Sequence, residues 1–326
     1  MKTSARLILL SFAALSVSVA AVCIGPTHLL DMSRLFELLR SGTSTPELER
    51  AALVFWELRL PRVLLAAAAG ANLALGGLLL QAIFRNPLAE PYLLGLSSGG
   101  ALGAVIALAM GASVVTWPAL AGSLIIGAVV LGVCRKRIAA DLPSLLLVGV
   151  ALGALAQAFT TAIILRFDPG ALRSILFWLM GSFAGRGWPE VWMLVPAALI
   201  GGAIVFFLHR PLDLLALGGE SAHHLGVRVS FLQTLGIALA AVLAALTVAA
   251  CGTIGFIGLM APHLARRLVG APHGVSVPAT ILVGAVLAVG ADLAARTILA
   301  GTELPVGVIT GAFGCIFFLA LLQRKN

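Results

Sequence analysis

Charged residues are scarce in this sequence. Asp, Glu, Lys and Arg make up 10% of its 326 residues, while hydrophobic residues make up 60%. Soluble domains carry about 25% charged residues, which keep their surfaces hydrated. Because so few charges cannot cover the surface of a water-soluble fold of this length, the composition excludes a soluble protein. It predicts an all-α polytopic membrane protein instead.

Cysteine and nucleotide-binding motifs are also in short supply. The four cysteines stand singly in apolar runs and form no CxxC pair, so they predict neither a disulfide scaffold nor a metal cluster. The GxxxxGK[ST] phosphate loop is missing, so the chain does not cradle a nucleotide in the usual way. We therefore expect no catalytic residue, no metal site and no cofactor bound by this chain.

Titratable side chains are rare inside the long apolar runs. Within the predicted spans we place only Asp292, four residues before Arg296, and the spacing predicts a salt bridge between the two near the membrane surface. Ion-coupled carriers usually need buried acids or histidines, so their scarcity disfavours such a carrier. A stand-alone channel stays possible, although no segment resembles a selectivity filter.

Long uncharged runs are what the sequence does contain. A helix needs about 20 apolar residues to cross a bilayer, so the 44 residues of 91–134 must hold two spans with a turn at 111–118. The run 229–262 is divided near Cys251. The start of the chain resembles a signal peptide, but we expect it to be retained as a first span. The predicted spans, ten in all, are 7–25, 63–84, two within 91–134, 142–165, 191–208, two within 229–268, 274–291 and 304–323.

The positions of the charges support this count. With both termini inside, the inner loops carry 12 of the 21 basic residues, including all three lysines, but only 4 of the 13 acidic ones. The outer loops carry equal numbers of both signs. This is the positive-inside pattern of membrane proteins, and it accounts for the net charge of +8 without a nucleic acid partner.

Two segments between the spans predict short helices. Residues 210–228, on the predicted inner side, mix helix formers with Gly218, Gly219 and Gly226, so they indicate two short helical pieces joined by a flexible elbow. Residues 171–183, on the predicted outer side, are apolar but too short to cross. We expect Trp178 and Trp188 to anchor that segment at the interface. The 210–228 loop is either an ordinary solvated connector or a surface that receives force from a partner.

Two motifs suggest chemistry that other features disfavour. Residues 95–99 match the G-x-S-x-G nucleophile pattern, which would make Ser97 the nucleophile of an intramembrane protease. Such a serine needs a histidine on a facing helix, and we place all six histidines in loops or at span ends. His223 and His224 are adjacent and therefore point about 100° apart on a helix, which is poor geometry for a shared metal.

Several motifs together resemble the permease subunits of ATP-binding cassette (ABC) importers for iron chelates and vitamin B12. The resemblance covers nearly the whole chain, in register. It is carried by Arg59-Leu-Pro-Arg62, by Gln81–Gly99 with its core Asn-Pro-Leu-Ala-Glu-Pro-Tyr, by Trp178-Leu-Met-Gly-Ser-Phe183, by Gly255-Phe-Ile-Gly-Leu-Met-Ala-Pro-His-Leu-Ala-Arg-Arg267 and by Glu303-Leu-Pro-Val-Gly-Val308.

The resemblance implies an architecture and a set of partners. The whole chain, 1–326, would be one permease domain in the bacterial plasma (inner) membrane, with ten spans and both termini in the cytoplasm. Two copies would form a homodimer with a central pathway. Two ABC ATPase subunits, which bind ATP and Mg²⁺, would sit on the cytoplasmic side, and a periplasmic or lipid-anchored substrate-binding protein would dock outside. The chain itself would not be an enzyme.

The resemblance also implies roles for individual residues. The 210–228 loop would couple to the ATPase through Leu217, Gly218, Gly219, Glu220, Ser221, Ala222, Leu225, Gly226 and Val227. Arg59 and Arg296 would pair with glutamates of the substrate-binding protein. The inner gate would lie at Leu142, Pro143 and Ser144, although Leu and Pro replace the small hydroxyl residues that some members carry there. An iron-siderophore or haem complex is the expected cargo, and cobalamin is the alternative.

Overall fold

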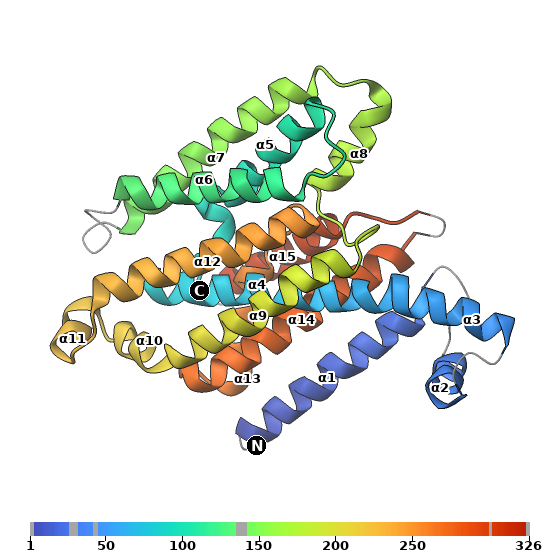
Figure 1. Ribbon diagram of the computed structural model, residues 1–326. Helices are drawn as coiled ribbons and strands as arrows, with labels where there is room; N and C mark the ends of the chain where they lie inside the picture. The colour runs from blue at the N-terminus through green and yellow to red at the C-terminus, as the bar shows by residue number, and fades with distance from the viewer. Residues whose placement is uncertain (1–2, 26–31, 42–44, 135–141, 300–301, 324–326) are drawn as a thin grey trace.

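The computed structural model describes residues 3–25, 32–41, 45–134, 142–299 and 302–323. These residues form helices joined by short turns (Figure 1). The helices are α1 Thr3–Cys23, α2 Met32–Ser41, α3 Pro46–Leu53, the π-helical turn η1 Val54–Arg59, α4 Leu60–Phe84, the 3-10 turn η2 Pro91–Leu94, α5 Leu96–Ala109, α6 Thr116–Cys134, α7 Leu142–Ile164, α8 Pro169–Leu179, α9 Trp188–Phe207, α10 His209–Ala216, α11 Gly219–His224, α12 Val229–Cys251, α13 Ile257–Val269, α14 His273–Thr297 and α15 Val306–Gln323.

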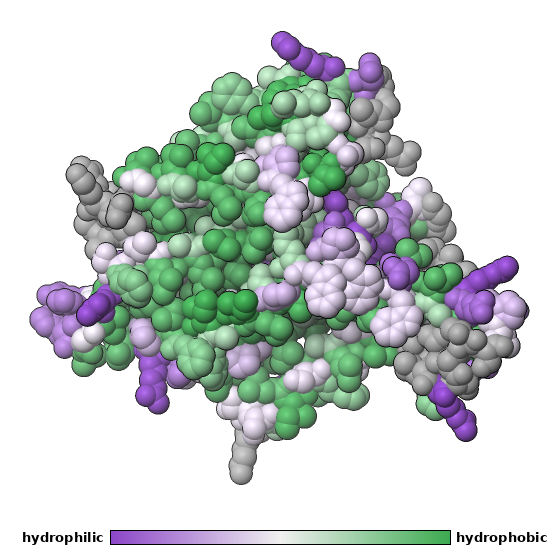
Figure 2. Space-filling model, viewed as in Figure 1, coloured by the Kyte–Doolittle hydropathy of each residue, from purple (hydrophilic) through white to green (hydrophobic). Residues whose placement is uncertain are grey.

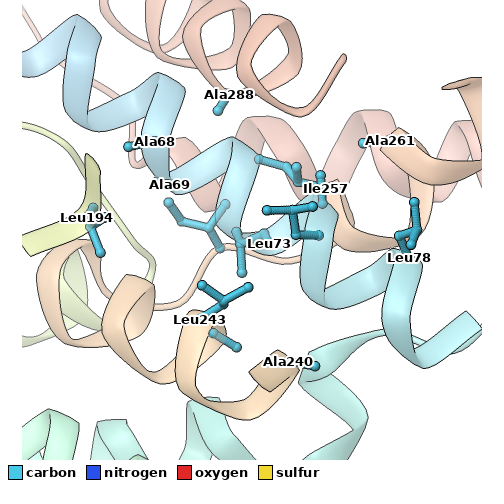
Figure 3. Close-up of a cluster of buried hydrophobic side chains, with 14 of the residues drawn as sticks. Ala68, Ala69, Leu73, Leu78, Leu194, Ala240, Leu243, Ile257, Ala261 and Ala288 are labelled. Atoms are coloured by element: carbon cyan, nitrogen blue, oxygen red, sulfur yellow. The ribbon is translucent and has the colours of Figure 1, made fainter. Parts of the chain in front are cut away.

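Helix α4 is the centre of the bundle. It is apolar on every face rather than amphipathic, and most of its side chains are buried, which is the pattern of a helix surrounded by other helices. It packs against α9, α12, α13 and α14. Figure 3 shows this core, in which Leu73 and Leu78 of α4 lie among Leu194, Leu243 and Ile257 from three of those helices.

Small residues set the distances between these helices. A Cβ atom added to Gly70 would lie 2.1 Å from the carbonyl oxygen of Gly284, and one added to Gly77 would lie 1.8 Å from that of Gly258. The backbones of α14 and α13 therefore touch α4 directly. Close backbone approach through glycine is how helices associate in lipid, where apolar surface alone gives no preference for a protein neighbour.

Helices α5, α6 and α7 form a second group against one side of the bundle, and α1 lies along the opposite edge (Figure 1). The surface of the bundle is broadly hydrophobic, with hydrophilic residues gathered at its ends (Figure 2). The exposed apolar side chains of α1, such as Phe12 at 66% exposure, suit contact with lipid.

Within the described residues, seven stretches are helical, long and apolar enough to cross a membrane: Thr3–Cys23, Pro46–Phe84, Thr116–Val133, Ser144–Ile164, Trp188–Phe207, Val229–Cys251 and His273–Thr297. The chain is thus a multi-pass, all-helical membrane protein, as predicted. Two of the other three predicted spans correspond to the shorter apolar helices α5 and α15. The third corresponds to α13, a 13-residue helix that ends with Arg266 and Arg267 in its last turn. The run 229–262 is divided where predicted, because α12 ends at Cys251 and α13 begins at Ile257.

Before the second predicted span, α3 continues without a break through η1 into α4. Two local expectations need correction. The outer short helix ends at Leu179, two residues before Gly181 takes a φ of +74°. Trp178, expected to anchor this segment, is buried in a small apolar cluster with Ala104 of α5, Ala119 of α6 and Ala249 of α12.

Candidate functional site

The 210–228 loop forms a compact two-helix unit at one end of the bundle (Figure 1). Helix α10 and helix α11 are joined at Gly218, whose φ of +116° is open to glycine but not to other residues without strain. Gly226, with a φ of +87°, closes the second piece. The sequence-based prediction of two short helices with a glycine elbow is confirmed.

The unit is seated on the bundle by apolar side chains. Leu212 and Leu215 of α10 and Ala222 of α11 are buried, each at 1% exposure or less. The predicted coupling residues otherwise face outward: Leu217 is 67% exposed and Leu225 is 58% exposed. Glu220, Ser221 and Gly226 are exposed as well, whereas Gly218, Gly219 and Val227 are half-buried. A groove of about 850 Å³ runs between α11 and the start of α12, with Arg85 and Arg228 in its lining.

An ionisable pair ties this unit to a membrane-spanning helix. The Oδ1 atom of Asp213, on α10, accepts a hydrogen bond of 2.9 Å from the backbone N–H of His273 and lies 2.6 Å from Nδ1 of the same residue. His273 is the first residue of α14, where backbone N–H groups lack helical partners and a negative charge is favourable. Through these contacts, a movement of α10 would pull directly on the first turn of α14.

The opposite end of the bundle carries a charged cleft of about 420 Å³, which we call the arginine cleft. Its lining combines η1, the start of α4, the turn before α9 and the end of α14. The lining residues are Val54, Glu57, Leu58, Arg59, Arg62, Phe183, Gly185, Arg186, Gly187, Arg296 and Glu303. The fold thus brings Arg59 and Arg296 to one site, although 237 positions separate them in the sequence.

Both arginines are buried, at 5% and 6% exposure, and both hold the end of α1. Nη1 of Arg59 donates to the carbonyls of Val22 and Cys23, at 2.8 and 2.7 Å. Nη2 of Arg296 donates to the carbonyl of Ala21 at 2.6 Å. The last carbonyls of a helix have no partner within it, so these guanidinium groups cap α1 from two other helices.

An ion-pair network joins two lining residues of the cleft, Arg62 and Glu303, to the buried Asp292. Arg62 forms hydrogen bonds with both oxygens of Asp292, the shortest at 2.8 Å, and with both oxygens of Glu303, at 3.0 and 3.1 Å. The predicted Asp292–Arg296 salt bridge is confirmed, with Nε and Oδ2 3.4 Å apart. The side chain of Asp292 is only 1% exposed, so its charge is stable there because two guanidinium groups face it.

The sequence profile of the FecCD transport family matches residues 7–324, almost the entire chain. The chain belongs to the FecCD transport family. FecCD proteins are the membrane permeases of ABC importers; they work with a separate ATPase and a substrate-binding partner and are not enzymes themselves. The resemblance stated from the sequence motifs is confirmed.

Curated relatives of this FecCD chain include permeases for two kinds of cargo. It is 38% identical over 324 residues to the Fe(3+)-citrate import system permease YfmE of Bacillus subtilis (strain 168), covering 97% of this chain and 92% of the relative. It is 39% identical over 281 residues to the cobalamin permease BtuC of Halobacterium salinarum, covering 85% and 75%. It is equally close to the vitamin B12 permease BtuC of Salmonella typhimurium (strain LT2), covering 85% of both.

Solved structures agree with the fold of this FecCD chain. A transporter described as of the metal-chelate ABC type, in an inward-facing conformation, matches with a TM-score of 0.86 and 34% identity over 98% of both chains. PsaBC from Streptococcus pneumoniae matches with a TM-score of 0.56 at 14% identity, over 90% of this chain and 99% of that one, which reflects the shared fold alone.

The remaining predicted site residues of the FecCD chain fall as follows. Leu142, Pro143 and Ser144 form the first turn of α7, although the side chains of Leu142 and Pro143 lie outside the described residues. Ser97 is buried in α5, which packs mainly on α6 and α7, whereas the described histidines lie on α10, α11, α13 and α14. Across the described residues no three His, Cys, Asp or Glu side chains gather into a metal-binding group.

Sequence reasoning missed one acidic position. Glu90, counted only as a loop charge, lies in a mostly apolar cavity of about 420 Å³ between the α4–η2 connection, Phe256 and α15. Burial raises the pKa of its carboxyl to about 7, and a hydrogen bond from the Phe256 backbone partly opposes this rise. Phe256 itself has a φ of +68°, rare for an aromatic residue, and its ring packs on Gly314. The signal available was the position of Glu90 within the Gln81–Gly99 motif.

Proposed function

We propose that this permease carries an iron chelate, a siderophore complex or haem, from a substrate-binding protein across the bacterial plasma membrane into the cytoplasm. The Fe(3+)-citrate permease aligns with 97% of the chain, which supports an iron chelate. The equally similar vitamin B12 permeases make cobalamin the second candidate. Bulky cargo of either kind suits a pathway between apolar helices that holds nothing tightly.

The proposal rests mainly on the exposed apolar surface of the α10–α11 unit. It presents large apolar side chains, Leu217 and Leu225, to solvent at one end of the bundle, yet it is pinned to α14 through Asp213. An exposed apolar surface on a firmly seated element is typical of a docking site. We propose that the ATPase covers this surface and that its closure on ATP moves α10 and α14 together, so that access alternates across the membrane.

The arginine cleft, at the other end, is the proposed docking site for the substrate-binding protein. Arg59 and Arg296 would meet glutamates of that protein, since charge pairs at the rim of an interface steer association and fix its register. The cleft contains more guanidinium groups than carboxylates, which supports an acidic partner.

With the ATPase at the α10–α11 end and the substrate-binding protein at the arginine cleft, we propose the following assembly. The chain would be one permease domain with ten spans, counting α5, α13 and α15, and with both termini in the cytoplasm. Two copies would form a homodimer around the pathway, with the inner gate at the first turn of α7, Leu142 to Ser144. ATP and Mg²⁺ would bind to the ATPase, and this chain would hold no cofactor.

Transport in reconstituted vesicles tests the proposal. The permease is inserted with its ATPase, and the purified substrate-binding protein is added outside with a labelled ferric siderophore, haem or cobalamin. We expect ATP-dependent accumulation of one iron chelate. Accumulation of cobalamin alone would establish the second candidate, and uptake by the permease without ATPase or ATP would overturn the importer mechanism.

A variant series tests the two docking sites. Leu225→Asp should abolish co-purification of the ATPase, while Phe36→Asp, at an apolar position on α2 that is even more exposed, should not. Charge reversal of Arg59 together with Arg296 should weaken binding of the substrate-binding protein at low salt. Unchanged affinity would show that these arginines serve the permease alone.

A further inference from the structure

Glu90 has no part in the proposed transport mechanism. It lies in the connection between α4 and η2 and lines the cavity of about 420 Å³ whose walls also include the start of α13 and part of α15. The ion pairs formed among the described residues do not include Glu90, and no cation contributes to the shift in its pKa. Its carboxyl therefore faces this cavity without a counter-ion.

The rest of the cavity wall is apolar and partly aromatic. Phe256 and Phe318 supply rings from the start of α13 and from α15, and leucines supply most of the remainder. Cys315, on α15, is the other titratable residue of the wall, and the lining that the structure describes contains no arginine, lysine or histidine. A single acidic group is thus set in an apolar cavity with aromatic sides.

The walls of the cavity are held in place by close backbone contacts. A Cβ atom added to Gly314 of α15 would lie 2.2 Å from Cγ of Phe256, so the ring of Phe256 rests directly on the α15 backbone. Pro91, the residue after Glu90, packs between α4 and α13, because a Cβ added to Gly76 or Gly258 would lie 3.0 or 3.1 Å from its ring. The cavity is therefore formed before any ligand enters, as ligand sites usually are.

These walls suit an organic cation better than a metal ion. Calcium and magnesium ions bind six or more oxygen atoms, counting water, and the cavity offers one carboxyl group among apolar side chains. An ammonium ion with an alkyl or aryl body needs one counter-ion, and apolar walls stabilise the rest of it. Aromatic faces attract ammonium groups as well. The volume of the cavity lies within the range of about 300–1,000 Å³ that is typical of small-molecule sites.

We propose that the Glu90 cavity binds a hydrophobic ammonium ion, with the Glu90 carboxylate as its counter-ion and the rings of Phe256 and Phe318 against its apolar body. The ammonium group belongs either to a free organic compound or to the headgroup of a membrane lipid, since the chemistry at Glu90 is the same. The site is separate from the arginine cleft and from the α10–α11 unit, so this inference does not rest on the proposed cargo or partners.

Binding of radiolabelled benzyltrimethylammonium to the full chain in phosphatidylglycerol nanodiscs tests the site. Binding to empty nanodiscs is subtracted. We expect saturable binding of one compound per chain at pH 8. Neopentylbenzene has the same shape without the charge, and we expect it to compete at least ten-fold less well. The absence of saturable binding, or equal competition by the neutral compound, would overturn the inference.

The dependence on pH identifies the group that binds the cation. The quaternary ammonium has a fixed charge, whereas burial raises the pKa of the Glu90 carboxyl to about 7. Its ionised fraction therefore rises from about 10% at pH 6 to about 90% at pH 8. We expect binding to be about ten-fold tighter at pH 8 than at pH 6. Equal affinity at the two pH values would contradict a role for this carboxylate.

Two variants alter the site from different sides. Glu90→Gln keeps the shape but removes the charge, and it should lose both the tight binding and its pH dependence. Cys315→Phe fills the cavity from α15 and should weaken binding at least several-fold, although Glu90 remains. Glu49→Gln, at an exposed position on α3, is the control and should bind like the parent chain. Parent-like binding by Glu90→Gln would show that the compound binds elsewhere.

A change of lipid separates the two sources of the ammonium group. The titration is repeated in nanodiscs that also contain phosphatidylethanolamine, whose headgroup carries an ammonium. If this lipid displaces the labelled compound from the parent chain, the occupant in the membrane is the lipid headgroup. If the affinity for the compound is unchanged, the site takes a free ammonium compound.

Discussion

Asp213 and His273 join the two-helix unit at one end of the bundle to the first turn of α14. A single carboxylate oxygen receives the backbone N–H of His273 at 2.9 Å and lies 2.6 Å from its Nδ1. The acid belongs to a surface helix and the histidine to a helix that packs on the central α4. A force on α10 can therefore reach the membrane core through α14, while α10 also packs on α4 itself.

Removal of this carboxylate should uncouple the importer. In Asp213→Ala the half-buried N–H of His273 loses a charged acceptor, which costs about 1–3 kcal/mol, and α10 can move without α14. We expect ATP hydrolysis in the reconstituted complex to persist while substrate transported per ATP falls at least several-fold. Arg210→Ala, at an exposed position on the same helix, is the control and should keep the parent ratio. Equal ratios in both variants would show that coupling runs elsewhere.

Loss of Arg62 should destabilise the end of the bundle that carries the arginine cleft. Arg62→Gln removes the closest cation from Asp292, whose side chain is 1% exposed. Breaking a buried ion pair from one side costs about 3–5 kcal/mol. Since Arg296 remains 3.4 Å away, we expect the lower part of that range, measured as a fall in the thermal unfolding midpoint in detergent.

A second substitution checks that cause. Asp292→Asn on the Arg62→Gln background removes the unpaired charge and should recover part of the lost stability. If the double variant lost as much as the sum of the single variants, the two side chains would not be coupled.

Gly77 should tolerate no side chain. Alanine there would place its Cβ 1.8 Å from the Gly258 carbonyl, so α13 would have to move away from α4. Overpacking of this kind costs about 1–3 kcal/mol or more, and we expect a lower unfolding midpoint and impaired transport. Gly290→Ala on α14 is the matched control, because no atom lies within 4 Å of its added Cβ. A midpoint as high in Gly77→Ala as in the control would contradict this packing.

Because of Glu90, we expect the stability of the protein to fall as pH rises, which is the opposite of the effect of a salt-bridged carboxylate. Its carboxyl titrates near 4.5 when exposed, and burial raises this pKa to about 7 in the folded chain. The folded state therefore binds more protons between these values, and stability falls as pH rises from 4.5 to about 7.

Glu90→Gln keeps the shape and the acceptor for Phe256 but stays neutral. We expect the variant to have the higher unfolding midpoint at about pH 8, with the difference vanishing at about pH 5. The control is Glu57→Gln, on η1 at the other end of the bundle, where exposure keeps the effect of charge small. A difference that did not change with pH would show that Glu90 is already ionised in the fold at no cost.

The sequence by itself determined the elements and their breaks. Run length predicted the seven stretches that are helical, long and apolar enough to cross a membrane, because the bilayer sets a minimum helix length. The glycines at 218 and 226 predicted the elbow and the end of the 210–228 loop, because both depend on local backbone conformation. The i, i+4 spacing of Asp292 and Arg296 predicted their salt bridge for the same local reason.

Only the tertiary structure decided which distant groups meet. The sequence predicted a salt bridge for Arg296, and the family resemblance implied docking roles for Arg59 and Arg296. Both side chains are in fact buried on carbonyls of α1, and Arg62 rather than Arg296 is the closest partner of Asp292. The pairs Asp213–His273 and Glu90–Phe256 likewise join groups that are distant in the sequence. The partners in these pairs lie from 36 to 275 positions apart, so they depend on how helices cross. In lipid those crossings are set by small residues whose contacts are themselves non-local.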